Sequence, residues 1–270
     1  MPFELTPLVV LQLAIIAASA AALVWMGVRG KLSEKHLGLG PTRDLREPAG
    51  VYLMGAYLVL GYSVMKLQVS GASAIELQFV VELMQFIAIG LLLGRARQAE
   101  AGFRKLGLLP RHPVRDLRWG VLGGVIGFGL VGLAGIVWAN LLTMLGEPVP
   151  DVAHESLVTL QQEFSLELLF LLIFSAVVMA PLLEELVFRG VLQTSLMRLM
   201  KGRRWPAMLI TAAAFSAIHG TIVPTTGLLP LFVLGLVFGY VYEHTGSLLT
   251  PILAHAVFNA MNIAIAIVPG

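Results

Sequence analysis

Long apolar stretches run through most of this 270-residue chain, and they constrain its fold more than any other feature. A helix that crosses a membrane needs about 20 consecutive, mostly apolar residues. Eight stretches approach or meet this length: 8–28, 50–67, 77–94, 119–144, 166–183, 205–220, 228–243 and 248–268. Backbone polar groups in lipid must be satisfied within the segment itself, which favours helices. We therefore predict an all-α, polytopic membrane protein with about eight transmembrane helices.

The composition agrees with a protein that lies in a lipid bilayer. Charged residues are only 13% of the chain, about half of the roughly 25% that is typical of soluble domains. The formal net charge of +2 is too small to indicate a nucleic-acid partner. The chain has no cysteine, which excludes cysteine nucleophiles, cysteine-ligated zinc, iron–sulfur clusters and disulfides.

The basic residues alternate between connecting segments. Sixteen of the 18 Lys and Arg lie in three segments, 29–50, 95–118 and 198–204. The segments between them hold none: 68–76, 145–165 and 221–227. The positive-inside rule then places both termini outside and the basic loops in the cytoplasm, at the plasma membrane if the source is prokaryotic. Of the two remaining basic residues, Lys66 can snorkel from the end of a span, whereas Arg189 lies within an apolar segment.

Polar residues inside the predicted spans concentrate in the C-terminal half. Ionisable side chains within membrane helices are costly and are functional hypotheses by default. Three sets qualify: Glu184-Glu185-x-x-x-Arg189, Phe215-x-x-x-His219 and His255-x-x-x-Asn259. The first four spans offer mainly Glu82, Gln85 and Lys66. We expect one membrane-embedded unit, in which residues 1–165 form a scaffold or gate and residues 166–270 hold a reaction centre.

The spacing within each set indicates its chemistry. Glu185 and Arg189 are four residues apart and can pair along one helix face, which leaves Glu184 for other work. His255 and Asn259 have the same spacing, and both types of side chain can donate hydrogen bonds to an oxyanion. Each set also has a structural interpretation, as a buried ion pair, a histidine at a helix end or a hydrogen bond between helices. In addition, Pro181 removes a backbone donor and predicts a kink, after which a second helical stretch continues over 184–199.

Two catalytic arrangements fit these residues. Glu184 and His219 could hold and deprotonate a water molecule that attacks a peptide carbonyl, while His255 and Asn259 stabilise the oxyanion. Alternatively, Glu184, His219 and His255 could ligate a catalytic zinc ion. The residues leave both arrangements open. A non-catalytic scaffold or immunity protein, or a proton-coupled transporter, is the alternative function, although transporters usually show broken helices in both halves.

The three motifs, in this order, resemble the signature of the type II CAAX prenyl endopeptidases and their bacterial relatives, the CPBP or Abi family of intramembrane proteases. The chain carries EELVFR from Glu184 to Arg189, FSAIH from Phe215 to His219 and HAVFN from His255 to Asn259. No signature position is substituted, and the resemblance covers about residues 175–262.

The resemblance implies an intramembrane endopeptidase that cuts near the C-terminus of a membrane-anchored peptide or protein, either a prenylated CAAX-type tail or a bacterial sorting tail. It implies Glu184 as the base that activates water, with His219 beside it, and His255 with Asn259 as the oxyanion site. Glu185, Arg189 and Phe215 would support them. We favour the metal-free mechanism over a zinc enzyme, because His255 and Asn259 at one helical spacing suit an oxyanion better than a ligand set.

Overall fold

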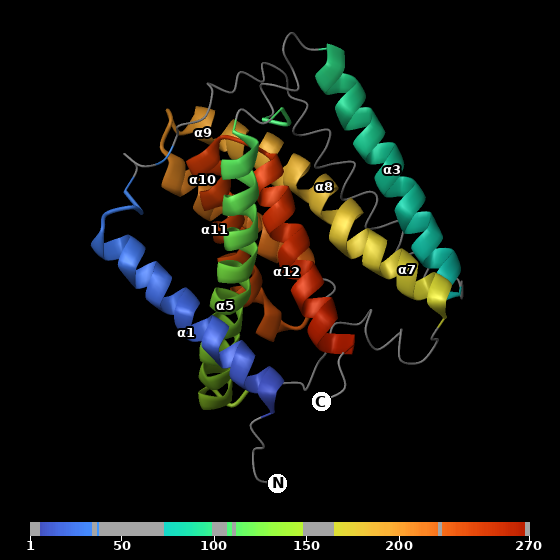
Figure 1. The fold of residues 1–270 in the computed structure, drawn as a ribbon. Coiled ribbons are helices and arrows are strands. Elements are labelled where there is room, and N and C mark those ends of the chain that lie inside the picture. The colour runs from blue at the N-terminus through green and yellow to red at the C-terminus, as the bar shows by residue number, and fades with distance from the viewer. Residues whose placement is uncertain are drawn as a thin grey trace.

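The structure, a computed structural model, describes residues 6–33, 37, 73–98, 107–109, 112–147, 165–220 and 223–267. Within these ranges the chain forms helices and turns without any β-strand, so the predicted all-α fold is confirmed (Figure 1). The separate long helices are α1 (Pro7–Val28), α3 (Ala74–Gln98), α5 (Pro113–Met144), α10 (Arg204–His219), α11 (Leu228–Thr245) and α12 (Leu249–Ile267). A continuous helical stretch contains α7 (Leu166–Phe174), η2 (Ser175–Met179), α8 (Ala180–Glu185), η3 (Leu186–Gln193) and α9 (Thr194–Leu199). The short 3-10 helix η4 (Thr225–Gly227) leads into α11.

Five helical stretches of the described residues are long and apolar enough to cross a membrane: Pro7–Val28, Pro113–Met144, Leu166–Leu199, Thr225–Thr245 and Leu249–Ala266. Two further predicted spans, 77–94 and 205–220, correspond to α3 and α10, which are not counted among the five. With 16 residues, α10 is about 24 Å long. The predicted span 50–67, including Lys66, lies outside the described residues. The prediction of several membrane helices is confirmed, and the number eight is approximate.

Helix α5 begins at Pro113, six residues before the predicted span. Proline suits the first turn of a helix, where its missing N–H has no intrahelical partner. The negative charge of Asp116 in that turn also interacts favourably with the positive end of the helix dipole. The predicted span began too late because its limits followed the apolar residues, whereas the first turn of the helix is polar. Asp116 is buried and accepts a hydrogen bond from Arg115 at 3.0 Å.

The starts and ends of the described helices lie together as expected if successive spans cross the membrane in alternating directions. Three side chains join one set of ends: Tyr240 and Trp205 donate to the carbonyls of Lys31 and Leu32 at 3.3 and 2.9 Å, and Arg115 donates to the carbonyl of Thr245 at 2.8 Å. These contacts gather the end of α1, the start of α5, the start of α10 and the end of α11. At the opposite end of α5, Trp138 donates to the carbonyl of Thr225, just before α11 begins.

Glycines allow α5 to pack closely against its neighbours. Helix α5 lies between α1 and α12, with α11 behind it (Figure 1). A Cβ atom at Gly124 would lie 2.6 Å from the Val257 Cβ atom and 2.7 Å from the Ala254 carbonyl oxygen of α12. Gly129 faces Ser19 of α1 in the same way. Small residues at helix interfaces are the usual means by which membrane helices approach each other.

The helix that carries the glutamate pair is irregular on both sides of it. Residues Ser175–Met179 are π-helical, with the Ala180 N–H donating to the Ser175 carbonyl five residues earlier. A second π-helical segment covers Leu186–Gln193. The distortion predicted at Pro181 therefore begins one turn before it, and the helix continues to Leu199. Such π-helical turns are frequent at functional sites.

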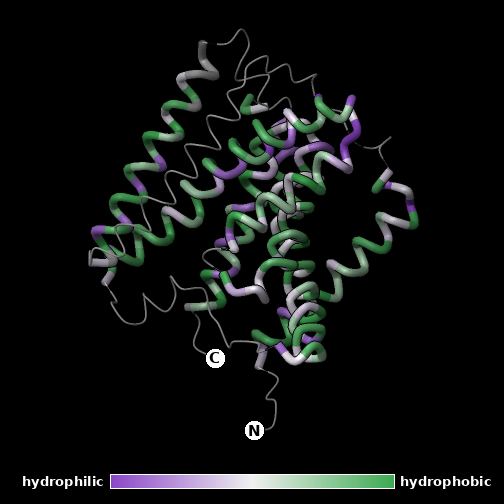
Figure 2. Tube along the Cα trace, turned by 180° about the vertical axis from the view of Figure 1, so that it is seen from behind, coloured by the Kyte–Doolittle hydropathy of each residue, from purple (hydrophilic) through white to green (hydrophobic). Residues whose placement is uncertain are grey.

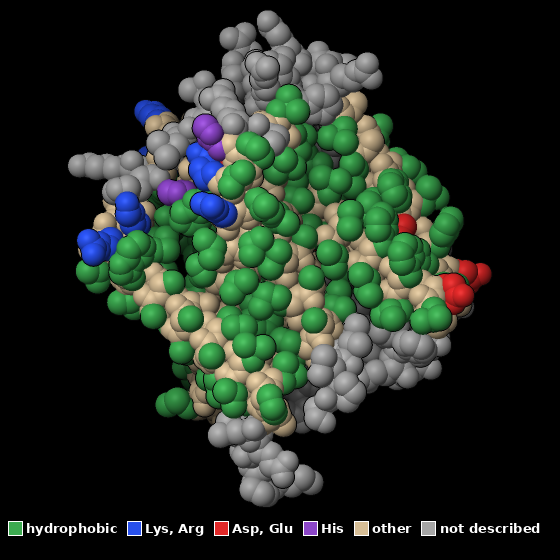
Figure 3. All heavy atoms as spheres, viewed as in Figure 1, with side chains coloured by type: hydrophobic (Ala, Val, Ile, Leu, Met, Phe, Trp, Pro, Cys, Tyr) green, Lys and Arg blue, Asp and Glu red, His purple; other side chains and the backbone are tan. Residues whose placement is uncertain are grey.

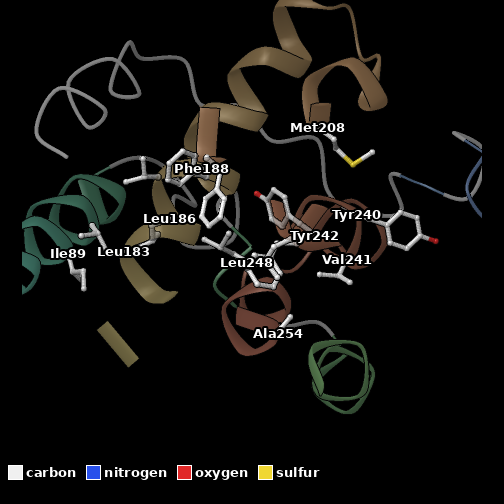
Figure 4. Packing of buried hydrophobic residues seen from close by; sticks show 14 of the residues in the cluster. Ile89, Leu183, Leu186, Phe188, Met208, Tyr240, Val241, Tyr242, Leu248 and Ala254 are labelled. Carbon is white, nitrogen blue, oxygen red and sulfur yellow. The ribbon is translucent and has the colours of Figure 1, made fainter. Parts of the chain in front are cut away.

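The surface is mainly apolar around the middle of the molecule, and charges gather at its edges. Figure 2 shows hydrophobic residues along most of every long helix. On the face in Figure 3, Lys and Arg lie at one end, and Asp and Glu lie at the opposite side. The buried core joins α8 and η3 to α10, α11 and α12, and Figure 4 shows Leu186, Phe188, Tyr242 and Leu248 within it.

Candidate active site

Glu185 is the centre of a buried polar cluster between α12 and the helical stretch Leu166–Leu199, which we call the glutamate helix. Its Oε1 atom accepts a hydrogen bond from Arg189 Nη1 at 2.8 Å, as the i, i+4 spacing predicts. The same oxygen lies 3.0 Å from His255 Nδ1, which is 70 residues further along the chain. Glu185 and Arg189 are both fully buried, and His255 is 4% exposed. One carboxylate oxygen thus joins two of the three motifs.

Arg189 is held by charge, a backbone carbonyl and aromatic rings. Its second terminal nitrogen, Nη2, donates to the Gly235 carbonyl of α11 at 3.0 Å. The guanidinium carbon lies 5.9, 5.0 and 5.3 Å from the ring centres of Phe188, Phe215 and Phe238. A buried cation is costly unless it is paired, and the planar guanidinium can meet a carboxylate, a carbonyl and ring faces together. Phe215 therefore has a definite supporting contact.

Glu184 and His219 face each other across a gap of 3.7 Å between Glu184 Oε2 and His219 Nε2. Glu184 is 8% exposed, and His219 ends α10. The other ring nitrogen, His219 Nδ1, lies 2.7 Å from the Phe215 carbonyl oxygen. Because a carbonyl only accepts, Nδ1 carries a hydrogen in this contact and Nε2 is the nitrogen that faces the carboxylate. The gap is longer than a direct hydrogen bond.

His255 and Asn259 lie one turn apart on α12 but have different partners. The His255 ring stacks on Phe238 at a centroid distance of 4.8 Å and meets the edge of Phe215 at 6.2 Å. Asn259 Nδ2 donates to the Ala176 carbonyl of η2 at 2.6 Å. The bond from Asn259 to Ala176 and the contact of His255 with Glu185 hold α12 against the helix that carries Glu184 and Glu185.

The C-terminal part of the chain matches a known protease family. Residues 166–261 match the family described as Type II CAAX prenyl endopeptidase Rce1-like. We refer to this matching segment as the Rce1-like domain. The resemblance predicted from the three motifs is confirmed, and the matched residues contain all of the candidate site residues.

Two curated proteins are similar to the chain in sequence. The membrane-embedded CAAX protease MroQ of Staphylococcus aureus (strain USA300) is 29% identical over 137 residues, which cover 50% of this chain and 53% of MroQ. A protein of Escherichia coli, described as an uncharacterized 24.3 kDa protein, is 29% identical over 126 residues, 47% of this chain and 58% of the relative. The chain thus spans a little over half the length of each relative. No solved structure matches it with significance.

The family match and the apolar helices together show an integral, multi-pass membrane protein, of which residues 166–261 match a CAAX protease family. The Rce1-like domain begins with the helical stretch Leu166–Leu199 and ends within α12. Glu184, Glu185 and Arg189 lie within one of the helical stretches that are long and apolar enough to cross a membrane, and His255 and Asn259 lie within another. Ionisable side chains in such helices are costly and are functional hypotheses by default.

The zinc alternative requires Glu184, His219 and His255 to surround one point. Among the residues that the structure describes, no group of three or more His, Cys, Asp or Glu is placed to hold a metal ion. Glu184 and His219 face each other, but His255 turns its Nδ1 atom to Glu185. The donor set Glu184, His219 and His255 is therefore not gathered around one point.

Several residues of the site were not predicted from the sequence. Phe238 stacks on His255 and lies beside Arg189, and Gly235 supplies a carbonyl to Arg189. Both lie in an apolar span that carries no motif. The contact between Glu185 and His255 was also missed, because the spacing indicated only Arg189 as the partner of Glu185. Glu82 and Gln85 are buried on α3, where Gln78 Nε2 donates to Glu82 Oε1 at 3.1 Å.

Proposed function

We propose that this protein is an intramembrane endopeptidase that hydrolyses a peptide bond near the C-terminus of a membrane-anchored peptide or protein. The Rce1-like domain and the similarity to MroQ support the reaction class. The observation that carries the mechanism is the pair Glu184 and His219, whose facing atoms lie 3.7 Å apart in a nearly buried site. The substrate is a prenylated CAAX-type tail or a bacterial sorting tail.

In this mechanism Glu184 is the general base. A water molecule donates one hydrogen bond to Glu184 Oε2 and the other to His219 Nε2, since both atoms accept. Glu184 takes a proton from the water as its oxygen attacks the scissile carbonyl carbon. Collapse of the tetrahedral intermediate breaks the C–N bond, and Glu184 gives the proton to the leaving amine. The second water proton stays with the new carboxyl group, so all atoms are accounted for.

His255 and Asn259 stabilise the oxyanion in the proposed mechanism. When both ring nitrogens of His255 carry hydrogens, Nδ1 donates to Glu185 and Nε2 is the donor for the oxyanion. Glu185 balances the charge of the imidazolium and holds its orientation, and Arg189 holds Glu185. Asn259 uses Nδ2 on Ala176, and that amide group has a second N–H for the substrate. Neither step requires a metal ion.

The decisive experiment replaces Glu184 with Gln, which keeps the shape of the side chain and removes the base. Purified protein in detergent or nanodiscs is incubated with membrane-anchored peptides that end in candidate tails, and the products are identified by mass spectrometry. We expect cleavage to fall at least about a hundredfold, because general acid–base catalysis contributes about 10²- to 10⁴-fold.

The matched control is Glu76→Gln, the same chemical change at an exposed glutamate in the first turn of α3. It should leave the rate within about twofold, since the amide oxygen of Gln can also accept the hydrogen bonds that Ser73 donates to Glu76. Cleavage by a purified and folded Glu184→Gln protein at the wild-type rate would contradict the proposed function. Addition of a chelator to the wild-type protein tests the zinc alternative, which predicts a loss of cleavage.

We also propose that the basic end of the molecule faces the cytoplasm, with both termini outside. The exposed basic residues of the described chain support this orientation: Arg29, Lys31, Arg118, Arg198, Lys201 and Arg203. Two acidic residues at this end, Asp116 and Glu243, are buried and lie 3.0 and 3.3 Å from arginine nitrogens. Exposed glutamates lie near the other ends of the helices, at positions 76, 147 and 167.

A further inference from the structure

The backbone carbonyl of Ala176 links Pro181 to Asn259, because it lacks a hydrogen-bond donor within its own helix. In η2 the N–H of Ala180 donates to the Ser175 carbonyl, five residues earlier. The next bond in the same register would join the Ala176 carbonyl to the N–H of residue 181, and proline has none. The α-helical alternative for Ala176 is the N–H of Ala180, which Ser175 already takes.

The side chain of Asn259 donates a hydrogen bond to this carbonyl. Its Nδ2 atom lies 2.6 Å from the Ala176 oxygen, although the two residues are 83 positions apart in the chain. A backbone carbonyl left without a donor away from water is costly, so the carbonyl and the amide satisfy each other. The same principle operates at the end of η3, where the Thr194 hydroxyl donates to the Arg189 carbonyl at 3.1 Å.

We propose that Pro181 is a positioning residue, which reserves the Ala176 carbonyl for Asn259 and thereby places the polar face of α12 against the glutamate helix. His255 lies one turn before Asn259 on the same face of α12. Fixing Asn259 on η2 therefore also fixes the approach of His255 to Glu185, four residues after the buried Pro181. This inference rests on the proposed function for its kinetic consequences, but its geometry can be tested separately.

The first test is Pro181→Ala, which returns an N–H to the helix. This N–H can donate to the Ala176 or Val177 carbonyl and competes with Asn259. We expect kcat to fall about tenfold with KM changed by less than about threefold, because small displacements of positioned groups are costly in catalysis. We also expect the thermal unfolding midpoint to stay equal or rise, because the helix gains a donor in its interior. A merely structural proline would not combine slower turnover with unchanged stability.

A double-mutant cycle with Asn259→Ala shows whether Pro181 acts through Asn259. We expect the double variant to be no slower than Asn259→Ala alone, within about twofold. The matched control is Pro230→Ala, at a buried proline in the first turn of α11. There the missing N–H would have no intrahelical acceptor, so Pro230→Ala should change neither kcat nor the effect of Asn259→Ala. If Asn259→Ala does not fold, Asn259→Asp replaces it, since an ionised carboxylate cannot donate to a carbonyl.

Hydrogen exchange of residues 249–262 provides a readout that does not depend on cleavage. Pro181→Ala should accelerate exchange in this part of α12 relative to the wild type, whereas Pro230→Ala should not. Unchanged exchange, wild-type turnover of Pro181→Ala, or losses that multiply in the double variant would each overturn the positioning role. If Glu184→Gln retains cleavage, the proposed function fails, and the exchange experiment still decides whether Pro181 positions α12.

Discussion

At the scale of single residues, Glu185 holds more side chains of the site in place than its neighbour Glu184 does. One of its oxygens accepts hydrogen bonds from Arg189 and His255, and all three side chains are buried or nearly so. Removing one partner of such a cluster leaves an uncompensated charge, whereas removing both leaves only a change in packing. Glu184, by contrast, faces His219 across a gap that suits a reacting water molecule.

We therefore expect Glu185→Gln to destabilise the protein by about 3–5 kcal/mol, because Arg189 loses its anionic partner within the membrane. The measurement is thermal or denaturant unfolding in a mild detergent. Glu76→Gln, at an exposed site, provides the control.

The double variant Glu185→Gln with Arg189→Met removes both charges and should recover a large part of the lost stability. Destabilisation of the double variant equal to the sum of the two single changes would contradict the pairing. Activity should stay low in both variants that carry Glu185→Gln, since His255 loses its carboxylate partner in each of them.

At the scale of helices, the central role belongs to α5, although it carries none of the motifs. Its glycines bring α1, α11 and α12 within close contact. Helix α12 is thus held on two sides, by α5 through Gly124 and by the glutamate helix through His255 and Asn259.

Gly124→Ala should displace α12, because the added Cβ atom would meet Val257 at 2.6 Å and the Ala254 carbonyl at 2.7 Å. We expect a loss of about 1–3 kcal/mol of stability, the usual cost of overpacking, and slower cleavage. Unfolding and turnover measurements on the same sample check both effects.

The matched control is Gly90→Ala in α3, where no atom lies within 4 Å of the added Cβ position. Alanine is the better helix former, so this variant should be as stable as the wild type or gain up to about 1 kcal/mol. Equal behaviour of the two variants would show that close packing of α5 on α12 is unimportant.

At the scale of the whole molecule, the two ends of the helices differ in charge, with exposed basic residues at one end and exposed glutamates near the other. The contacts of Tyr240, Trp205 and Arg115 place the starts and ends of four helices at the basic end. This arrangement agrees with alternating crossings, and the positive-inside rule supplies the direction.

Because the chain has no cysteine, single cysteines can report this orientation without background labelling. In intact bacterial cells that express the protein, Lys201→Cys should resist a membrane-impermeant maleimide and react only after the membrane is opened. Glu167→Cys, in the first turn of α7, should react in intact cells. The opposite pattern would reverse the proposed orientation, and labelling of both positions in intact cells would contradict a single orientation.

The amino-acid sequence by itself determined the helical class, the approximate spans and the three motifs. Apolar length is enough to predict a membrane helix, because lipid leaves the backbone no other partner than itself. The pairing of Glu185 with Arg189 also followed from spacing, since four residues make one helical turn. The proposed roles of Glu184, His219, His255 and Asn259 stay predictions that the experiments above test.

Only the tertiary structure decided which helices bring these motifs together. His255 meets Glu185 across 70 residues, Asn259 meets Ala176 across 83, and Arg189 meets the Gly235 carbonyl across 46. No local spacing encodes such contacts, because they depend on how α5, α11 and α12 pack around their small residues. The carbonyl that Asn259 takes is available for a local reason, the proline at position 181, but its occupant comes from a helix that only the fold places beside it.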